Sequence, residues 1–308
     1  MEHRRVGSLS VSSVGLGCNN FGVRLDAAQT ERVVHAALDA GINFFDTADV
    51  YGGTKSEELL GRALGKRCDE VIVATKFGLP LDDTSKGARP EYVRRAVEDS
   101  LRRLGTDRID LYQLHRPDPE VPIADTLGAL DELVRAGKVR EIGASNFTLE
   151  QLREAERAVA QGGARFVSLQ NEYSLLVREP ERGVLQESAD KGIGFLPYFP
   201  LASGLLTGKY AKGAPAPKGT RLAAPEAPLT ARFLSERNLE LAAQLKAFAE
   251  SRGHSVLELA FSWLLARPAV SSVIAGATSA EQIYANVAAA GWKLDADQLS
   301  ELDRLAPR

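Results

Sequence analysis

Cysteine and histidine are scarce in this sequence of 308 residues, which contains two cysteines and four histidines. Cys18 and Cys68 stand far apart and form no CxxC motif, and no histidine has another histidine or a cysteine at ligand spacing. Zinc sites need such clusters, and disulfide frameworks need matched cysteines. We therefore expect two reduced thiols and no metal site.

Long apolar runs and blocks of one charge sign are also missing. No stretch reaches the length of a membrane span, and residues 1–17 lack the apolar core and cleavage site of a signal peptide. The 38 basic and 41 acidic residues are mixed along the chain and leave a net charge of -3. We therefore expect a cytoplasmic protein that binds neither membranes nor nucleic acid.

The sequence does contain enough apolar material for a large core. Hydrophobic residues make up 44% of the chain and charged residues 26%, as in ordinary globular proteins. A barrel of alternating strands and helices commonly uses about 250 residues as one domain. We expect one domain over residues 1–308.

Short apolar runs alternate with amphipathic segments along the chain. Eight runs have the short length, β-branched content and flanking glycines of buried strands. They span residues 14–18, 42–46, 71–76, 109–115, 140–145, 166–171, 193–198 and 270–276. Segments between them, such as 88–105 and 123–137, repeat apolar residues at helical spacing. Eight such units predict an α/β protein with a (β/α)8 TIM barrel, and residues 4–15 predict a short N-terminal hairpin at its bottom.

An open doubly wound sheet is the alternative architecture. Its dinucleotide fingerprint has one approximate match, Gly15-x-Gly17, but Asn20 stands where a third glycine is required. A loop candidate follows this match instead of a helix. The barrel is therefore favoured.

Residues 209–230 form a long stretch that is rich in proline, alanine and glycine. Ordinary connections in a barrel are much shorter. The segment is either a solvated surface loop or a lid that closes over a bound ligand.

Three polar side chains stand where apolar runs end. The second run ends at Asp46, the third at Lys76 and the fourth at His115, and Tyr51 follows in the loop after Asp46. In a barrel these strand ends meet at the functional face. Each residue also has an ordinary structural explanation. Asp46 could cap a turn, Lys76 could extend its ammonium to solvent, His115 could be a hydrogen-bonded core residue, and Tyr51 could pack on the rim. Together they indicate a site, because charged side chains are rarely buried unless they are paired.

The four side chains suggest a tyrosine that acts as a general acid. A phenol has a reference pKa of about 10, and a nearby ammonium stabilises its anion. We therefore expect Lys76 to lower the pKa of Tyr51 toward neutrality. Asp46 would hold Lys76 charged, and His115 would orient a carbonyl beside the phenol.

Several ordered segments resemble the aldo-keto reductase superfamily. GINFFDTADVYG at 41–52 is similar to its first signature, DSLRRLGTDRIDLYQLHRPD at 99–118 is similar to its second, and VIVATKFG at 71–78 contains the lysine. The resemblance continues through GKVREIGASNF, LQNEYSLL and VIAGATSAEQIYANV. It implies NAD(P)H-dependent reduction of aldehydes and ketones to alcohols. By the same resemblance Tyr51 is the proton donor of a catalytic tetrad formed by Asp46, Tyr51, Lys76 and His115.

The resemblance also implies a nicotinamide cofactor, since no side chain supplies a hydride. NADPH is the expected cofactor and NADH the alternative. Ser145, Asn146 and Gln170 match the positions that bind the carboxamide, and Tyr198 matches the tyrosine that stacks on the ring. The other matched contacts are Cys18, Asn19, Leu201, Gly204, Lys209, Gly276, Thr278, Ser279, Gln282 and Asn286.

The phosphate end of the expected cofactor site departs from the usual pattern. Ser279 and Gln282 have the spacing of a capping box that opens a helix, and a helix N-terminus suits an anion. Many relatives carry arginine or lysine just after the position of Thr278, where this chain has Ser279 and Ala280. The preference for NADPH is therefore weaker than usual. Thr278, Ser279 and the helix end are still expected to bind its phosphate.

The substrate pocket is expected to have an apolar wall made by Phe21, Phe77 and Phe199, with Arg116 at a polar end. A long C-terminal loop that would cover this wall is expected to be absent after residues 301–308. An open site for small or varied aldehydes and ketones is therefore expected.

Other functions are compatible with some of these residues. A cofactor-binding sensor or regulatory subunit, like the potassium-channel β subunits of the same superfamily, would keep the fold with slow or no turnover. An isomerase would use Lys76 in a Schiff base. A barrel hydrolase is disfavoured, because G-x-S-x-G fails where Phe147 replaces the last glycine.

Overall fold

Eight parallel strands form one sheet in the computed structural model, which describes residues 1–224 and 227–307. The strands lie in the order β10-β3-β4-β5-β6-β7-β8-β9. Their bounds are β3 Val14–Gly17, β4 Phe44–Asp46, β5 Ile72–Phe77, β6 Ile109–Leu114, β7 Val139–Ser145, β8 Phe166–Gln170, β9 Gly194–Phe195 and β10 Val273–Gly276. Phe195 of β9 closes the sheet toward β10, because its carbonyl accepts from the Ser271 N–H at 2.9 Å and its N–H donates to the Ala269 carbonyl at 2.7 Å.

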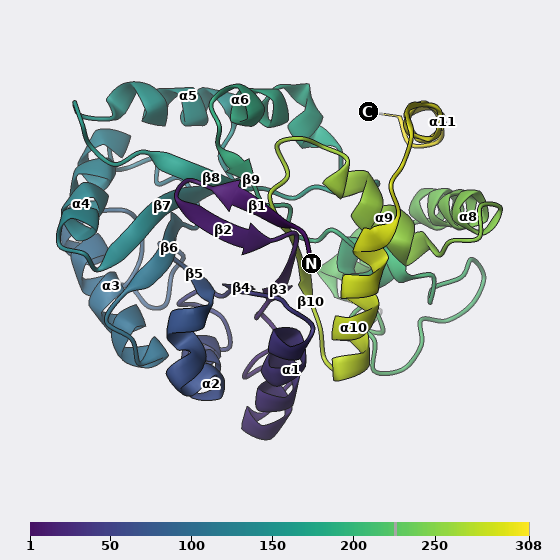
Figure 1. The fold of residues 1–308 in the computed structure, drawn as a ribbon, viewed down its shortest axis with the longest axis horizontal. Helices are drawn as coiled ribbons and strands as arrows, with labels where there is room; N and C mark the ends of the chain where they lie inside the picture. Colours follow the sequence, from purple (N-terminus) through teal and green to yellow (C-terminus); the bar gives the residue numbers. More distant parts are fainter. Residues whose placement is uncertain (225–226, 308) are drawn as a thin grey trace.

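Helices connect consecutive strands and cover the outside of the sheet (Figure 1). The helices that follow β3 to β8 and β10 are α1 Ala27–Asp39, α2 Lys55–Leu64, α3 Pro90–Leu104, α4 Ile123–Arg135, α5 Leu149–Ala158, α6 Val184–Asp190 and α10 Ala280–Ala288. Between β9 and β10 run α7 Pro228–Phe233, α8 Glu236–Glu250 and α9 Val256–Leu265, and α11 Ala296–Leu305 follows α10. This alternation confirms the (β/α)8 barrel over the open sheet.

Capping residues set the helix ends. At the start of α1, the Asp26 side chain accepts from the Gln29 N–H at 2.8 Å, and the Gln29 side chain accepts from the Asp26 N–H at 3.0 Å. At the end of α3, Gly105 adopts the left-handed conformation with φ 68. Within the described residues, no helix combines the length and apolar character that crossing a membrane requires.

A short hairpin lies across one end of the barrel (Figure 1). Strand β1 His3–Val6 pairs antiparallel with β2 Leu9–Ser12. Val6, Leu9 and Val11 are fully buried and pack against the inward side chains of the barrel, including Phe44. The predicted hairpin is confirmed, and its apolar side chains seal the end of the barrel opposite the polar strand ends.

Alternation along β5 decides which side chains enter the barrel. Ile72 and Ala74 pack in the inner cluster with the hairpin, whereas Val73 and Phe77 pack in the outer cluster between sheet and helices. Because side chains of a strand alternate between its faces, Lys76 follows Ile72 and Ala74 into the interior. It stands there at the C-terminal end of the strand.

Residues 209–224 of the long segment form a loop that packs against the barrel mouth, and residues 228–230 begin α7. Leu222 is fully buried, and its N–H donates to the Tyr210 hydroxyl at 3.3 Å. Arg24 donates to the Gly219 carbonyl at 2.5 Å. The loop is therefore docked along part of its length and is not solvated throughout. Residues 225–226 of the segment lie outside the described residues.

Candidate active site

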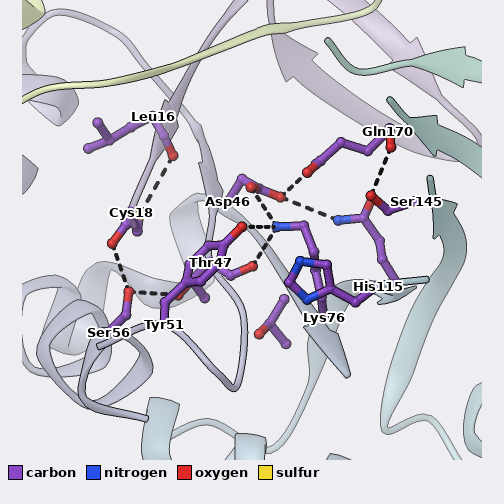
Figure 2. A network of polar contacts seen from close by, with 12 residues as sticks. Leu16, Cys18, Asp46, Thr47, Tyr51, Ser56, Lys76, His115, Ser145 and Gln170 are labelled. Carbon is purple, nitrogen blue, oxygen red and sulfur yellow. Dashed lines mark hydrogen bonds and ion pairs between the residues drawn. The ribbon is translucent and has the colours of Figure 1, made fainter. Parts of the chain in front are cut away.

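Lys76 is the centre of a buried polar group at the barrel mouth (Figure 2). Its ammonium donates to Asp46 Oδ2 at 2.7 Å, to the Thr47 carbonyl at 2.8 Å and to the Tyr51 hydroxyl at 3.5 Å. The Lys76 side chain is 0% exposed and that of Asp46 is 5% exposed. Burial opposes the charge of Lys76, but Asp46 and Tyr51 outweigh it and raise the pKa of Lys76. The lysine is therefore a fixed cation beside the phenol.

Two glutamine amides satisfy the second oxygen of Asp46. Asp46 Oδ1 accepts from Gln170 Nε2 at 2.9 Å and from Gln113 Nε2 at 3.3 Å. Gln170 was expected to bind a cofactor carboxamide, but one of its amide hydrogens is already used here. Gln113 was not anticipated from the sequence. It lies in β6 directly beside Lys76 of β5. Its position as a polar residue inside an apolar strand could have indicated that it belongs to the site.

The structure reverses the expected shift of the Tyr51 pKa. Burial raises the pKa of Tyr51 above its ordinary value, Lys76 opposes this effect, and Asp46 adds to it. Lys76 does not prevail because burial is the larger effect, and because its ammonium lies closer to Asp46, at 2.7 Å, than to the phenol, at 3.5 Å. Tyr51 is therefore protonated at neutral pH. Its hydroxyl is therefore able to donate a hydrogen bond into the cavity that Tyr51 lines.

His115 stands beside the phenol as a neutral imidazole. Its ring meets the ring of Tyr51 edge-on, with centroids 5.8 Å apart and an interplanar angle of 80°. Burial, with smaller contributions from the charges of Lys76 and Arg116, lowers the pKa of His115 to about 3. Its Nδ1 is buried and has no hydrogen-bond partner within the described part of the chain. A neutral imidazole can give or take one hydrogen bond next to Tyr51.

A cavity of about 690 Å³ opens above this group. Asp46, Tyr51 and His115 line it, and Lys76 lies beneath them. Every cofactor contact expected from the sequence also lines the cavity, except Ser279. The structure thus brings together residues from the ends of many strands, spread over most of the chain.

Ser145, Asn146 and Tyr198 form a connected chain of side chains on one wall of the cavity. The Ser145 hydroxyl donates to the Gln170 carbonyl at 2.8 Å, and Asn146 Nδ2 donates to the His115 carbonyl at 2.9 Å. The Tyr198 hydroxyl donates to Asn146 Oδ1 at 2.8 Å. Asn146 has the left-handed φ of 61 that this arrangement requires. These bonds fix the wall against which a planar ring could lie.

The start of α10 differs in detail from the expected capping box. Ser279 does cap the helix, since its Oγ accepts from the Gln282 N–H at 3.4 Å. The Gln282 carboxamide, however, accepts from the Thr278 N–H at 2.9 Å and from the Thr278 hydroxyl at 3.3 Å. The N–H and the hydroxyl of Thr278 are therefore already bonded to Gln282, whereas Ser279 uses its oxygen as an acceptor. Neither side chain carries a positive charge.

Arg24, Lys209 and Arg221 supply positive charge at the cavity wall. Arg221 donates to the side-chain oxygens of Asn19 and Asn20 at 3.3 and 3.0 Å. Burial lowers the pKa of Lys209, and Arg24 and Arg221 lower it further. Among residues 1–224 and 227–307, none of the three cations has an acidic partner. An anionic group that entered here would relieve their mutual repulsion.

Two of the four expected substrate residues do not reach the cavity. Arg116 and Phe199 line it, but Phe21 and Phe77 are fully buried. Phe77 points outward from β5 and stacks on Tyr112, with ring centroids 4.7 Å apart. The inward position of Lys76 requires this, because neighbouring side chains of a strand face opposite sides.

The wall also contains an ion pair that was not predicted from the sequence. Arg232 donates to both carboxylate oxygens of Glu172 at 2.8 Å, and both residues line the cavity. Arg116 has no hydrogen bond or ion pair within the described residues, although its charge acts on His115 and Tyr198.

Residues 13–307 match the model of the aldo/keto reductase family. Aldo-keto reductase YhdN of Bacillus subtilis (strain 168) is 36% identical over 99% of this chain and 93% of its own length. A probable voltage-gated potassium channel subunit beta of Arabidopsis thaliana is 34% identical over 94% of this chain and 91% of its own length.

A solved structure has the same architecture. The glycerol dehydrogenase of Gluconobacter oxydans has a TM-score of 0.84 and 32% identity, and the match covers 98% of this chain and 94% of that one. The resemblance noted in the sequence signatures is thereby confirmed across the barrel. The chain belongs to the aldo/keto reductase family.

Proposed function

We propose that this protein reduces aldehydes and ketones to alcohols with NADPH and that Tyr51 is the general acid. The observation that carries the proposal is the Tyr51 hydroxyl at the floor of the cavity, 3.5 Å from the buried ammonium of Lys76 and beside a neutral His115. These are the groups needed to protonate a carbonyl oxygen. All of residues 1–308 would act as one barrel domain.

Each of the four side chains has a distinct role in this proposal. The cofactor supplies a hydride to the carbonyl carbon when it is bound. Tyr51 gives its proton to the carbonyl oxygen as negative charge develops there. Lys76 stabilises the phenolate that remains, and Asp46 holds Lys76 in place. His115 donates a hydrogen bond to the same carbonyl oxygen and orients it.

The residues around the cavity fit a dinucleotide. Tyr198, held by Asn146, offers a ring face for the nicotinamide, and Ser145 lies beside it. Arg24, Lys209 and Arg221 offer positive charge for the phosphates. They would replace the cation that is missing after Thr278, so NADPH is favoured over NADH even though the Thr278 hydroxyl is already bonded to Gln282.

Replacing Arg221 with glutamine is expected to weaken NADPH binding more than NADH binding. A hydrogen bond to a charged group contributes about 1.5 to 3 kcal/mol, which corresponds to a loss of about tenfold to a hundredfold in affinity. Quenching of intrinsic fluorescence during titration with each cofactor measures the loss.

Lys218→Gln is the matched control for that experiment. Lys218 lies on the same loop, is exposed and does not line the cavity. Its replacement should leave both affinities unchanged. Equal affinity of Arg221→Gln and the original protein for NADPH would exclude Arg221 as a phosphate ligand.

The expected substrates are small or varied carbonyl compounds. The cavity wall offers Phe199 as an apolar surface and Arg116 as a polar end. In a panel assay that follows nicotinamide absorbance, small aldehydes should turn over faster than a bulky steroid ketone. Equal turnover of the steroid would contradict the open-site proposal.

A cofactor-binding regulatory subunit is the second candidate, since a potassium-channel β subunit is among the similar proteins. The intact tetrad favours the reductase instead, because a sensor needs no proton donor. Tight NADPH binding without turnover of any carbonyl would favour the regulatory function.

A further inference from the structure

A second buried polar cluster lies behind the tetrad and takes no part in the proposed chemistry. Its members are Asp49, Glu57, Thr75, Tyr92 and Arg103. They come from the turn after β4, from α2, from β5 and from α3. Asp49, Glu57 and Thr75 are each 0% exposed. The charges of these residues must therefore be balanced within the cluster.

Glu57 is the well-partnered carboxylate of the cluster. It accepts from Arg103 Nε at 2.6 Å and from the Thr75 hydroxyl at 2.6 Å. Arg103 is itself mostly buried, with a side chain that is 11% exposed. The guanidinium of Arg103 is thus bonded to Glu57, and their charges cancel.

Asp49 is the poorly partnered carboxylate. Its Oδ1 is buried without a hydrogen-bond partner among the residues described, and its Oδ2 accepts one bond of 3.5 Å from the Tyr92 hydroxyl. The Val50 N–H also acts on the carboxyl and lowers the pKa of Asp49. Glu57 from α2 repels its charge and Arg103 from α3 attracts it. Tyr112 from β6 also faces it, and its hydroxyl has no hydrogen-bond partner in the described part of the chain. Arg95 lies over the Tyr92 ring at 5.3 Å.

Burial and Glu57 together raise the pKa of Asp49 to about 7, although Arg103 opposes them. Protonated Asp49 leaves the cluster neutral, because Glu57 and Arg103 cancel. Ionised Asp49 leaves a net negative charge in a space closed to water.

The turn that contains Asp49 also carries the proposed proton donor. The Asp49 N–H donates to the Lys76 carbonyl at 3.0 Å, and the Tyr51 N–H donates to the Ala48 carbonyl at 3.1 Å. The Thr47 carbonyl accepts from the Lys76 ammonium at 2.8 Å. A displacement of Asp49 toward water would therefore move Tyr51 relative to Lys76.

We infer that Asp49 is a titrating positioning residue, which holds the Tyr51 turn in its active geometry when neutral and loosens that turn when ionised. The inference rests on the proposed function, because it assumes that Tyr51 is the proton donor. It adds an ionisation outside the tetrad to the pH dependence of the reaction.

Asp49→Asn tests this role, since asparagine keeps the shape of the protonated carboxyl and cannot ionise. In the original protein, kcat/KM should fall about tenfold between about pH 6 and about pH 8, while in Asp49→Asn this fall should be absent. Asp83→Asn is the matched control. Asp83 is exposed on a loop, so its replacement should keep the original profile.

Thermal melting gives a readout that does not depend on turnover. A carboxyl whose pKa is about 7 in the folded protein, against an ordinary value of 3.8, stabilises the fold fully below that ordinary value. The contribution is lost as pH rises through 7. The melting temperature of the original protein should therefore fall relative to that of Asp49→Asn over this range.

A second variant tests the same role if Asp49→Asn does not fold. Tyr92→Phe removes the only side-chain hydrogen bond that the Asp49 carboxyl accepts among the described residues, so the pH at which kcat/KM falls should move higher. If kcat/KM fell at the same pH in the original protein and in both variants, the inference about Asp49 would be overturned, but the proposed function would stand. No turnover by the original protein at any pH would overturn the proposed function.

Discussion

Replacing Tyr51 with phenylalanine is expected to lower kcat/KM for carbonyl reduction by about 10²- to 10⁴-fold, the range that a general acid contributes. The ring can keep its edge contact with His115, because only the hydroxyl is lost. That hydroxyl makes one long bond of 3.5 Å with Lys76, so the fold should be preserved. Steady-state kinetics with NADPH and a small aldehyde measure the loss.

Two measurements separate loss of the proton donor from general damage. The affinity of Tyr51→Phe for NADPH should match that of the original protein, because a phenylalanine ring fills the same space. Tyr284→Phe is the matched control, since Tyr284 is 50% exposed on α10 and lies away from the cavity wall. Undiminished turnover by Tyr51→Phe would exclude Tyr51 as the acid.

Replacing Lys76 with methionine is expected to inactivate the protein and also to destabilise it. The phenolate would lose its neighbouring cation, so proton transfer from Tyr51 would become costly. Asp46 would be left as an unpaired buried charge, which typically costs about 3 to 5 kcal/mol. Kinetics and urea unfolding measure the two effects.

The double variant Asp46→Asn with Lys76→Met distinguishes these two consequences. It removes both charges of the buried pair, so most of the lost stability should return. Activity should not return, because the cation beside Tyr51 is still absent. If the double variant recovered turnover, the catalytic role of Lys76 would be refuted.

The barrel and the grouping of the tetrad could be predicted because they depend on regular patterns. Strand length, flanking glycines and helical spacing repeat along the chain, and β5 and β6 lie where those patterns indicated. Parallel strands in a barrel end at one face, so Asp46, Lys76 and His115 had to meet there.

Other features depend on tertiary contacts that no local pattern encodes. Arg221 reaches the cavity only because its loop docks on Asn19 and Asn20. Asp49 is buried because α2 and α3 pack over the turn that contains it. The sequence of this turn resembles an ordinary polar turn, so the burial could not be predicted. Burial raises the pKa of Tyr51 more than the charge of Lys76 lowers it. The extent of this burial depends on the folded structure and could not be judged from the sequence.

The placement of Phe77 was predictable but was missed. Lys76 and Phe77 are neighbours in a strand, so they cannot both face the interior. A strict use of the alternation would have assigned Phe77 to the layer under the helices, where it packs on Tyr112.

The most direct test of the central proposal is the rate of NADPH oxidation by the original protein with a panel of small aldehydes, followed at the absorbance of the reduced nicotinamide. We expect steady turnover that requires both NADPH and a carbonyl compound and that Tyr51→Phe lacks. Tight binding of NADPH with no turnover of any carbonyl would contradict the reductase assignment.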